Sequence, residues 1–139
     1  TRGFGLNPEV GVFEACERPG YWRDDVEEEH GTGLQFLPAA KPTSPWRSLA
    51  AQTGFSLLLD QLRDGYDLVI LDCPPTLASA DGTMVARLAD RAVIVAAWDQ
   101  TAIGAIRHVT RTLRRSPEAT GVLVNRVPPG YRFGRLRPD

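Results

Sequence analysis

The chain has few cysteines and no long apolar run, and each scarcity excludes a class of protein. Two cysteines among 139 residues, Cys16 and Cys73, are too few for a disulfide framework, and their spacing matches no metal motif. No stretch reaches the roughly 18 apolar residues that cross a bilayer. The start of the chain also has no basic segment followed by an apolar core, so no signal peptide is expected. These absences predict a protein of the reducing cytoplasm.

The chain also has little net charge, but its charges are unevenly placed. The formal net charge of −1 predicts no strong general attraction to nucleic acid. From residue 107 onward the chain carries about +6, and the residues before it carry about −7. Three interpretations of this arginine-rich end, with its basic tail at 128–139, stay open. The first is a solvated helix face and tail, and the second is contact with an acidic partner or with the anionic cytoplasmic leaflet. The third and least favoured is binding of nucleic acid.

Short apolar runs divide the chain. The clearest is DLVILD at 67–72, which is followed by Cys73 and two prolines. A short run that is apolar at every position suits a strand buried on both faces of a parallel sheet. Similar runs occur at 91–97 and 120–127, with a weaker one at 33–39. These segments predict four parallel strands.

Amphipathic periods between these runs predict helices at 46–63, 81–88 and 102–115. Strands that alternate with helices indicate an α/β fold, a parallel sheet with flanking helices, in a single domain over 1–139. Residues 17–32 are expected to form a loosely ordered, solvated connection. The stripes predicted to face the core are Leu49, Phe55, Leu58, Leu59 and Leu62 in one helix and Ile103, Ile106, Val109 and Leu113 in another.

Asp72 is the first candidate for chemistry, because it closes the run at 67–72. In open α/β sheets, ligands bind outside the carboxyl ends of the strands. A carboxylate at that place can hold Mg²⁺ directly or through water. An apolar strand that ends in Asp is also the second half of a phosphate-binding P-loop site. The alternative is an Asp at a strand end that caps the following turn.

Several short motifs follow one another in a consistent order. Asp72-Cys73-Pro74-Pro75 is followed by Asp81, then by ADRAVIVAA, Thr101 and GVLVN, and GLQFLPAA lies upstream. This order resembles the carboxy-terminal two thirds of the MinD/ParA-like P-loop ATPases. In particular, it is similar to the capsular and exopolysaccharide branch that contains the bacterial tyrosine kinases. The resemblance covers essentially the whole chain and implies a P-loop NTPase-like fold.

The resemblance implies roles for residues around the first of these motifs. Asp72 would be the Walker B acid, which acts on the water shell of Mg²⁺ and on the attacking group. Pro74 and Pro75 would shape a switch-like loop. Asp81 matches a recurrent Asp of the family, with either a structural role or a role in polarising a ligand.

The last motif, GVLVN, implies contacts with the base of ATP. Asn125 would face the adenine edge, where an amide can both donate and accept, and Arg126 would lie beside the base. The alternative for Asn125 is a strand-end residue that satisfies backbone groups. Tyr131, the one tyrosine in the tail, is either a phosphoacceptor or an aromatic anchor at the chain end.

The phosphate-gripping motif of the family does not occur in this sequence. No G-x-x-x-x-G-K-[ST] segment is present, and the only lysine, Lys41, has no glycine context. The resemblance therefore implies that the first strands and the P-loop lie upstream of Thr1. The chain alone is not expected to hydrolyse ATP.

The resulting hypothesis is the ATP-binding cytoplasmic domain of a regulator of polysaccharide biosynthesis or export. With its P-loop, the domain would be an ATPase or an autophosphorylating tyrosine kinase that uses ATP and Mg²⁺. Its expected partners are a membrane polysaccharide co-polymerase or chain-length regulator and further copies of itself. It would therefore work in the cytoplasm, at the inner face of the membrane. The alternatives are a non-catalytic interaction module and a MinD/ParA-type positioning ATPase.

Overall fold

The computed structural model describes residues 10–39, 53–113 and 119–131. The chain divides into two compact units, residues 1–73 and 74–139, and each is described here by itself. The predicted helix start at 46–52, Lys41 and most of the basic tail lie outside the described residues. In the described part, no helix is long and apolar enough to span a membrane.

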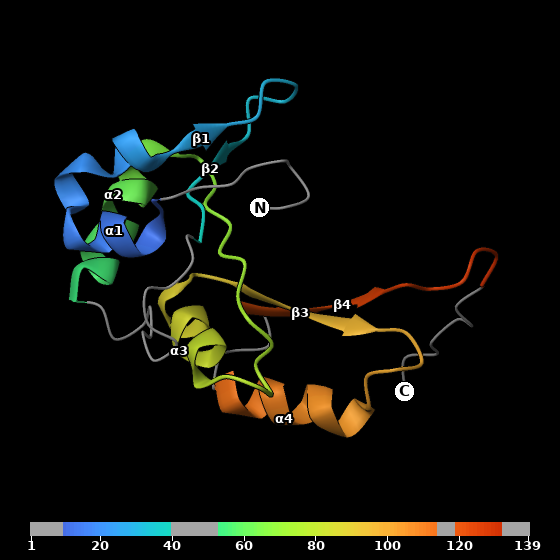
Figure 1. Cartoon of the computed structure of the whole chain (residues 1–139). Helices are drawn as coiled ribbons and strands as arrows, with labels where there is room; N and C mark the ends of the chain where they lie inside the picture. The colour runs from blue at the N-terminus through green and yellow to red at the C-terminus, as the bar shows by residue number, and fades with distance from the viewer. Residues whose placement is uncertain (1–9, 40–52, 114–118, 132–139) are drawn as a thin grey trace. The chain divides into compact units, whose positions relative to one another are not determined.

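Helices form the core of the first unit (Figure 1). They are α1 (Val12–Glu17), the 3-10 helix η2 (Pro19–Asp25) and α2 (Thr53–Gly65). The helices α1 and α2 approach so closely that a Cβ atom on Gly54 would lie 1.8 Å from the carbonyl oxygen of Cys16. The predicted stripe of α2 is confirmed over its described part, and it packs in one core with α1 and η2. The buried side chains are Ala15, Cys16, Trp22, Phe55, Leu58, Leu59 and Leu62.

A small antiparallel hairpin completes this unit. Its strands are β1 (Glu27–Glu28) and β2 (Gln35–Phe36), and Glu27 pairs with Phe36. Gly33 adopts a left-handed φ of 71° that allows the chain to reverse. The prediction of a loosely ordered connection at 17–32 is therefore wrong, as is that of a parallel strand at 33–39. The 3-10 helix η2 and the local turn geometry give this segment a regular structure, although its many acidic residues suggested a solvated loop.

The predicted strand at 67–72 does not form. None of the described residues pairs with it in a ladder, and it runs as an irregular segment after α2. Leu68 and Ile70 are 75% and 78% exposed, whereas Val69 and Leu71 are half-buried. This alternation is typical of an extended chain. A strand is defined by hydrogen bonds to a neighbour, and the apolar run specifies burial without supplying that neighbour.

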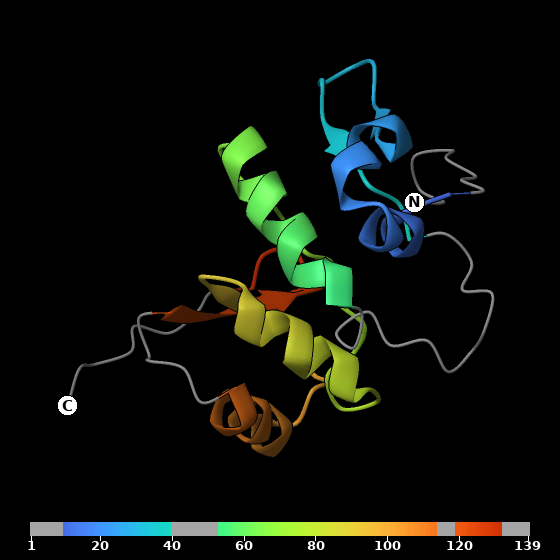
Figure 2. The ribbon, with the colours of Figure 1, turned by 90° about the vertical axis from the view of Figure 1, so that its left-hand side faces the viewer.

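Two parallel strands and two helices form the second unit. The strands β3 (Ala92–Ala97) and β4 (Thr120–Asn125) pair in register from Ala92 with Thr120 to Ala97 with Asn125. Between them runs α4 (Ile103–Leu113), the crossover helix that parallel neighbours require. The helix α3 (Ala80–Leu88) lies beside α4, and Figures 1 and 2 show both helices. These elements confirm the predicted strands at 91–97 and 120–127 and the helices that begin near 81 and 102.

The predicted apolar stripe of α4 is only partly buried. Val109 and Leu113 lie in the core and Ile106 is half-buried, but Ile103 is 69% exposed. Ile103 opens the helix just after the end of β3, where the described residues do not cover it. The prediction that all four residues face the core is therefore wrong at this end.

Candidate functional site

Asp72 ends the irregular segment with its side chain exposed. Within the described part of the chain its carboxylate accepts no hydrogen bond and forms no ion pair. The interpretation of Asp72 as a cap of the next turn therefore has no support from contacts. An exposed, uncommitted carboxylate is free to bind a water molecule or a cation.

Cys73 follows Asp72 and is half-buried. Burial raises the pKa of the Cys73 thiol, and the neighbouring Asp72 carboxylate raises it further. The thiol lies 3.6 Å from the carbonyl oxygen of Leu71, to which it donates. Because the thiolate is the reactive form of cysteine, this environment favours a packing role for Cys73 over a nucleophilic one.

The Pro74–Pro75 loop is tied to the start of α3. The carbonyl oxygen of Pro75 accepts hydrogen bonds from the backbone nitrogens of Ala78 at 3.0 Å and Ser79 at 3.1 Å. Ser79 caps α3, and its Oγ accepts from the backbone nitrogen of Asp81 at 3.2 Å. Asp81 itself lies in the first turn, where the helix dipole stabilises an acid. These contacts give Asp81 a place in helix capping.

Gly82 allows this loop to lie against α3. A Cβ atom at position 82 would lie 2.6 Å from the carbonyl oxygen of Pro74, which is closer than real Cβ contacts allow. The sequence analysis did not single out Gly82. Only the structure shows that a side chain is excluded there, since the position has no motif of its own.

The carboxyl ends of β3 and β4 form one edge of the two-stranded sheet, and polar side chains lie along this edge. The backbone nitrogen of Trp98 donates to the carbonyl oxygen of Asn125 at 2.8 Å, which continues the pairing of the strands. Thr101 closes the turn after β3, because its Oγ1 accepts from the backbone nitrogen of Ala97 at 3.0 Å. Asp99 in that turn has a left-handed φ of 54°.

Asn125 lies at this edge and uses its side chain locally. Its Oδ1 accepts the backbone N–H of Arg126 at 2.8 Å, and Arg126 adopts a left-handed φ of 61°. The side-chain carbonyl of Asn125 thus satisfies the backbone N–H of Arg126, as the alternative interpretation of this residue expected. Its amide nitrogen makes no hydrogen bond within the described residues and remains a donor.

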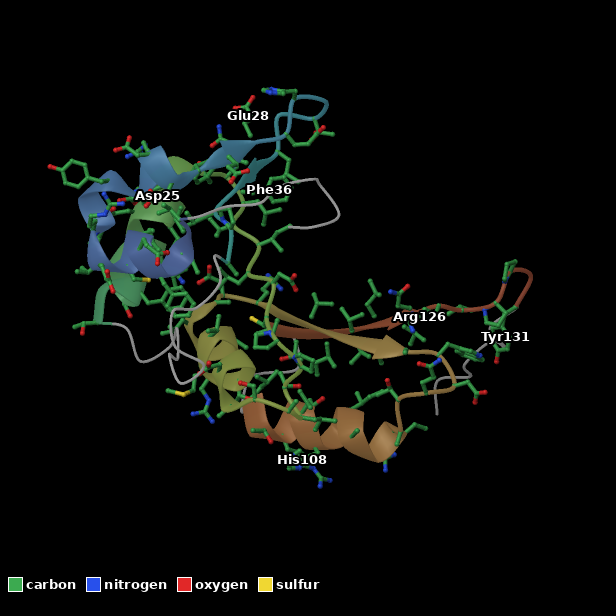
Figure 3. The ribbon with its side chains drawn as sticks, in the orientation of Figure 1. Asp25, Glu28, Phe36, His108, Arg126 and Tyr131 are labelled. Atoms are coloured by element: carbon green, nitrogen blue, oxygen red, sulfur yellow. The ribbon has the colours of Figure 1, made fainter. Side chains whose placement is uncertain are left out.

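Tyr131 packs against Trp98 across the same edge. Their ring centroids are 4.3 Å apart and the rings are tilted by 57°. Figure 3 shows Tyr131 and Arg126 on the segment that follows β4. The sequence analysis did not identify Trp98, because the two rings are far apart in the chain and no local pattern connects them.

The structure thus brings together Trp98, Asn125, Arg126 and Tyr131 within the second unit, and it places Pro74, Pro75 and Asp81 in a loop of the same unit. Asp72 belongs to the first unit. No group of three or more metal-binding side chains occurs among the described residues. Asp72 would therefore offer a cation one carboxylate, which fits Mg²⁺, since this ion keeps several waters and also binds substrate phosphates.

A separate cavity of about 680 Å³ lies in the first unit. Tyr66 donates a hydrogen bond to Gln35 there, and the Arg23 guanidinium lies 4.4 Å from the centre of the Trp22 ring. None of the predicted site residues lines this cavity. The residues that do are Trp22, Arg23, Val26, Glu28, Gly33, Leu34, Gln35, Gly65, Tyr66 and Leu68.

Comparison with known proteins gives a consistent group of relatives. The chain is 35% identical over 143 residues to a putative tyrosine-protein kinase EpsB of Ralstonia solanacearum, with 96% of this chain and 19% of that protein aligned. It is 26% identical over 122 residues to tyrosine-protein kinase ptk of Acinetobacter johnsonii, covering 88% of this chain and 16% of the relative. The chain thus spans about a fifth of the length of these relatives. No protein-family model matches it.

Two solved structures have folds similar to the fold of this chain. The BceF tyrosine kinase domain is 28% identical with a TM-score of 0.65, over 81% of this chain and 48% of that one. The kinase domain of Escherichia coli tyrosine kinase ETK is 22% identical with a TM-score of 0.74, over 94% and 53%, and this likeness supports the fold alone. The resemblance found in the sequence is confirmed. The homologues are bacterial tyrosine-protein kinases, and the chain matches the carboxy-terminal part of a tyrosine kinase of the capsular and exopolysaccharide type.

Proposed function

We propose that the chain forms part of an ATP-binding, P-loop NTPase-like tyrosine kinase domain that acts in polysaccharide biosynthesis or export. The observation that carries this proposal is the uncommitted carboxylate of Asp72, directly after an apolar run, in a relative of named tyrosine kinases. The names of those relatives favour kinase activity over ATP hydrolysis alone.

Asp72 is the proposed Walker B acid. Its exposed carboxylate would accept hydrogen bonds from the water shell of Mg²⁺, and it would orient that shell toward the nucleotide. The bound ion would neutralise charge on the phosphates of ATP during phosphoryl transfer. Asp72 needs no ligand partner from the described residues for this role, because Mg²⁺ is commonly held by one or two carboxylates with water and phosphate.

Asn125 and Arg126 are the proposed contacts with the adenine base. The side-chain carbonyl of Asn125 already accepts a hydrogen bond from the backbone N–H of Arg126. The side-chain amide nitrogen of Asn125 is therefore the group left to donate to a ring nitrogen of adenine. The guanidinium of Arg126 is planar and could stack beside the base. Pro74 and Pro75 would shape the loop next to the phosphates, and the capped start of α3 supports that loop.

Tyr131 is the proposed phosphoacceptor within this chain, and its half-exposed ring supports that role. The protein would act in the cytoplasm at the inner face of the membrane, in homo-oligomers and with a membrane polysaccharide co-polymerase or chain-length regulator. The support for these partners is the relationship to kinases of this type.

The test is phosphoryl transfer by the full-length protein with ATP and Mg²⁺. Asp72→Ala should lower transfer at least about 100-fold, because it removes an electrostatic contact made to the reacting groups. Asp64→Ala, which removes another exposed carboxylate, is the matched control. Unchanged turnover in Asp72→Ala would contradict the Walker B assignment.

Phosphotyrosine analysis separates the two enzymatic outputs. A kinase should accumulate phosphotyrosine, and Tyr131→Phe should remove the part of the signal that this residue carries. Release of ADP without any phosphotyrosine would instead show an ATPase. The absence of both would favour a non-catalytic interaction module.

A further inference from the structure

Two aromatic rings lie at the carboxyl ends of the paired strands, and one of them has no role in the proposed function. Trp98 is the first residue after β3, and its ring centroid lies 4.3 Å from that of Tyr131 with a tilt of 57°. The indole is half-buried, and Tyr131 is 47% exposed. We call these two residues the aromatic corner. Both belong to the second unit, so their contact does not depend on where the first unit lies.

The strand register places the aromatic corner beside the proposed base contacts. The parallel pairing ends with Ala97 opposite Asn125, and the backbone nitrogen of Trp98 donates to the carbonyl oxygen of Asn125 at 2.8 Å. Trp98 is therefore the cross-strand neighbour of Arg126, the residue after Asn125. An indole, a side-chain amide and a guanidinium thus come from adjacent backbone positions at one edge of the sheet. Ligands of open α/β sheets bind at this edge.

Local hydrogen bonds hold the backbone around Trp98 in place. Thr101 Oγ1 accepts from the backbone nitrogen of Ala97 at 3.0 Å. The backbone nitrogens of Gln100 and Thr101 donate to the carbonyl oxygen of Ala97 at 3.3 Å and 3.0 Å. Asp99 completes the turn with a left-handed φ of 54°. A side chain carried by such a turn is ordered before a ligand arrives, which lowers the entropy lost on binding.

The groups at this edge match the surface of a nucleobase. Every base can stack on an aromatic ring, because each base has a π face. The side-chain amide nitrogen of Asn125 supplies a hydrogen-bond donor next to the indole. The Arg126 guanidinium forms no hydrogen bond or ion pair within the described residues, so its planar group is also available to a ligand. A planar ring system with acceptor atoms on its rim fits this combination.

We propose that the indole of Trp98 is the stacking surface for the base of the bound nucleotide, and that Tyr131 is a positioning residue that supports the indole. This inference rests on the proposed binding of ATP by the full-length protein. It adds to Asn125 and Arg126 a residue that fixes the plane of the base. One hydrogen bond from Asn125 leaves the base free to tilt, whereas a stacking face restricts the tilt. Only the ring of Tyr131 is needed for the support.

The binding of two ligands to the full-length protein tests the stacking. Mg²⁺–ATP carries the base, whereas Mg²⁺–tripolyphosphate carries three phosphates without base or ribose, and calorimetry measures both affinities. Trp98→Leu should weaken ATP binding at least about fivefold, because it removes a base–aromatic stack, and it should leave tripolyphosphate binding unchanged. Trp98→Phe keeps a ring and should retain most of the affinity for ATP. Tyr131→Leu should weaken ATP binding less than Trp98→Leu does.

His108→Leu is the matched control. It also replaces a planar ring by an aliphatic side chain in the second unit, but His108 is exposed on the side of α4 that points away from β3 and β4 (Figure 3). Its affinity for both ligands should equal that of the unmodified protein. Matching circular dichroism melting curves of all variants exclude unfolding as the cause of any loss.

The outcomes separate this inference from the proposed function. Unchanged ATP binding in Trp98→Leu would overturn the stacking while ATP binding itself stands. Equal losses for ATP and tripolyphosphate would assign Trp98 to the structure of the strand ends and would also contradict the inference. The same holds, without any variant, if the unmodified protein binds ATP no more tightly than tripolyphosphate. An unmodified protein that binds neither ligand would refute the proposed function, and the inference with it.

Discussion

The two units of the chain hold their apolar side chains in opposite ways. The first unit encloses Trp22, Phe55 and Leu58 among three short helices. The second unit leaves Val93 and Val95 63% exposed on its two-stranded sheet, although its pairing and its crossover helix are regular. Regular hydrogen bonding and a closed core are therefore separate properties. In this chain, the more irregular unit has the better enclosed core.

The division also separates the proposed functional groups. Asp72 belongs to the first unit, whereas Asn125 and Arg126 belong to the second. The candidate contacts with the base lie at the ends of paired strands, and the candidate metal-side carboxylate follows a segment without a ladder. Sheet pairing thus fixes the backbone near Asn125. The backbone near Asp72 has no such pairing with the described residues, and the run that precedes it is largely exposed.

Core truncation should give the largest contrast between the units. Leu58→Ala removes a fully buried side chain and should lower the free energy of unfolding by about 2–5 kcal/mol. Val95→Ala, at a largely exposed position, should change it by no more than about 0.5 kcal/mol. Urea titrations of both variants measure the difference. Equal effects would show that the face with Val95 is buried in solution.

Filling the contact at Gly82 should have the next largest effect. Gly82→Ala forces a Cβ atom against the carbonyl oxygen of Pro74, and we expect a loss of about 1–3 kcal/mol. Gly104→Ala is the control, because no atom lies within 4 Å of its added Cβ. That substitution should stabilise α4 by about 0.5–1 kcal/mol. Thermal melts that rank the variants the other way would contradict the close approach of the Pro74–Pro75 loop to α3.

Removal of the α3 cap should have a smaller effect within the second unit. Ser79→Ala deletes the side-chain acceptor for the backbone nitrogen of Asp81 and should cost about 1 kcal/mol. Ser79→Asp keeps an acceptor at the cap and should restore most of this stability. Denaturation that does not distinguish the two variants would mean that the cap does not hold the helix start.

Acid titration should show the smallest effect, in the first unit. Hydrogen bonds from Thr32 and Gly31 lower the pKa of Glu29 from its ordinary value of 4.5. Its ionised form therefore contributes stability that is complete above pH 4.5 and is lost as the pH falls through the lower, folded-state value. Glu29→Gln should flatten this part of the stability curve. Thr32→Ala, which removes the strongest of these bonds, should flatten it partly.

The sequence was sufficient where the signal is local. The apolar runs at 91–97 and 120–127 and the helical period at 81–88 predicted β3, β4 and α3 well, because burial and repeat length determine these elements directly. The run at 67–72 has the same composition but did not form a strand, since a ladder also needs a neighbour. The β1–β2 hairpin was missed because its acids show no apolar alternation, and a glycine turn orders it instead.

The site shows the same limit. The position of Asn125 at a strand end was predicted correctly, but its bond to the Arg126 N–H depends on a left-handed backbone that no motif encodes. The pairing of Trp98 with Tyr131 joins two distant parts of the chain. The roles of Asp72, Asn125 and Arg126 in nucleotide binding remain predictions, and the Asp72→Ala variant tests the first of them.

The intrinsic fluorescence of the tryptophans can report on each of the two units. Trp22 is buried and touches Tyr66, whereas Trp98 is half-buried at the strand ends, in contact with Tyr131. Their fluorescence should therefore peak at shorter wavelength for Trp22 and at longer wavelength for Trp98. With Trp46 replaced by Phe, emission on the red side would follow events beside Asn125, and emission on the blue side would report the integrity of the helical core. One unlabelled sample could then follow nucleotide titration and unfolding as separate signals.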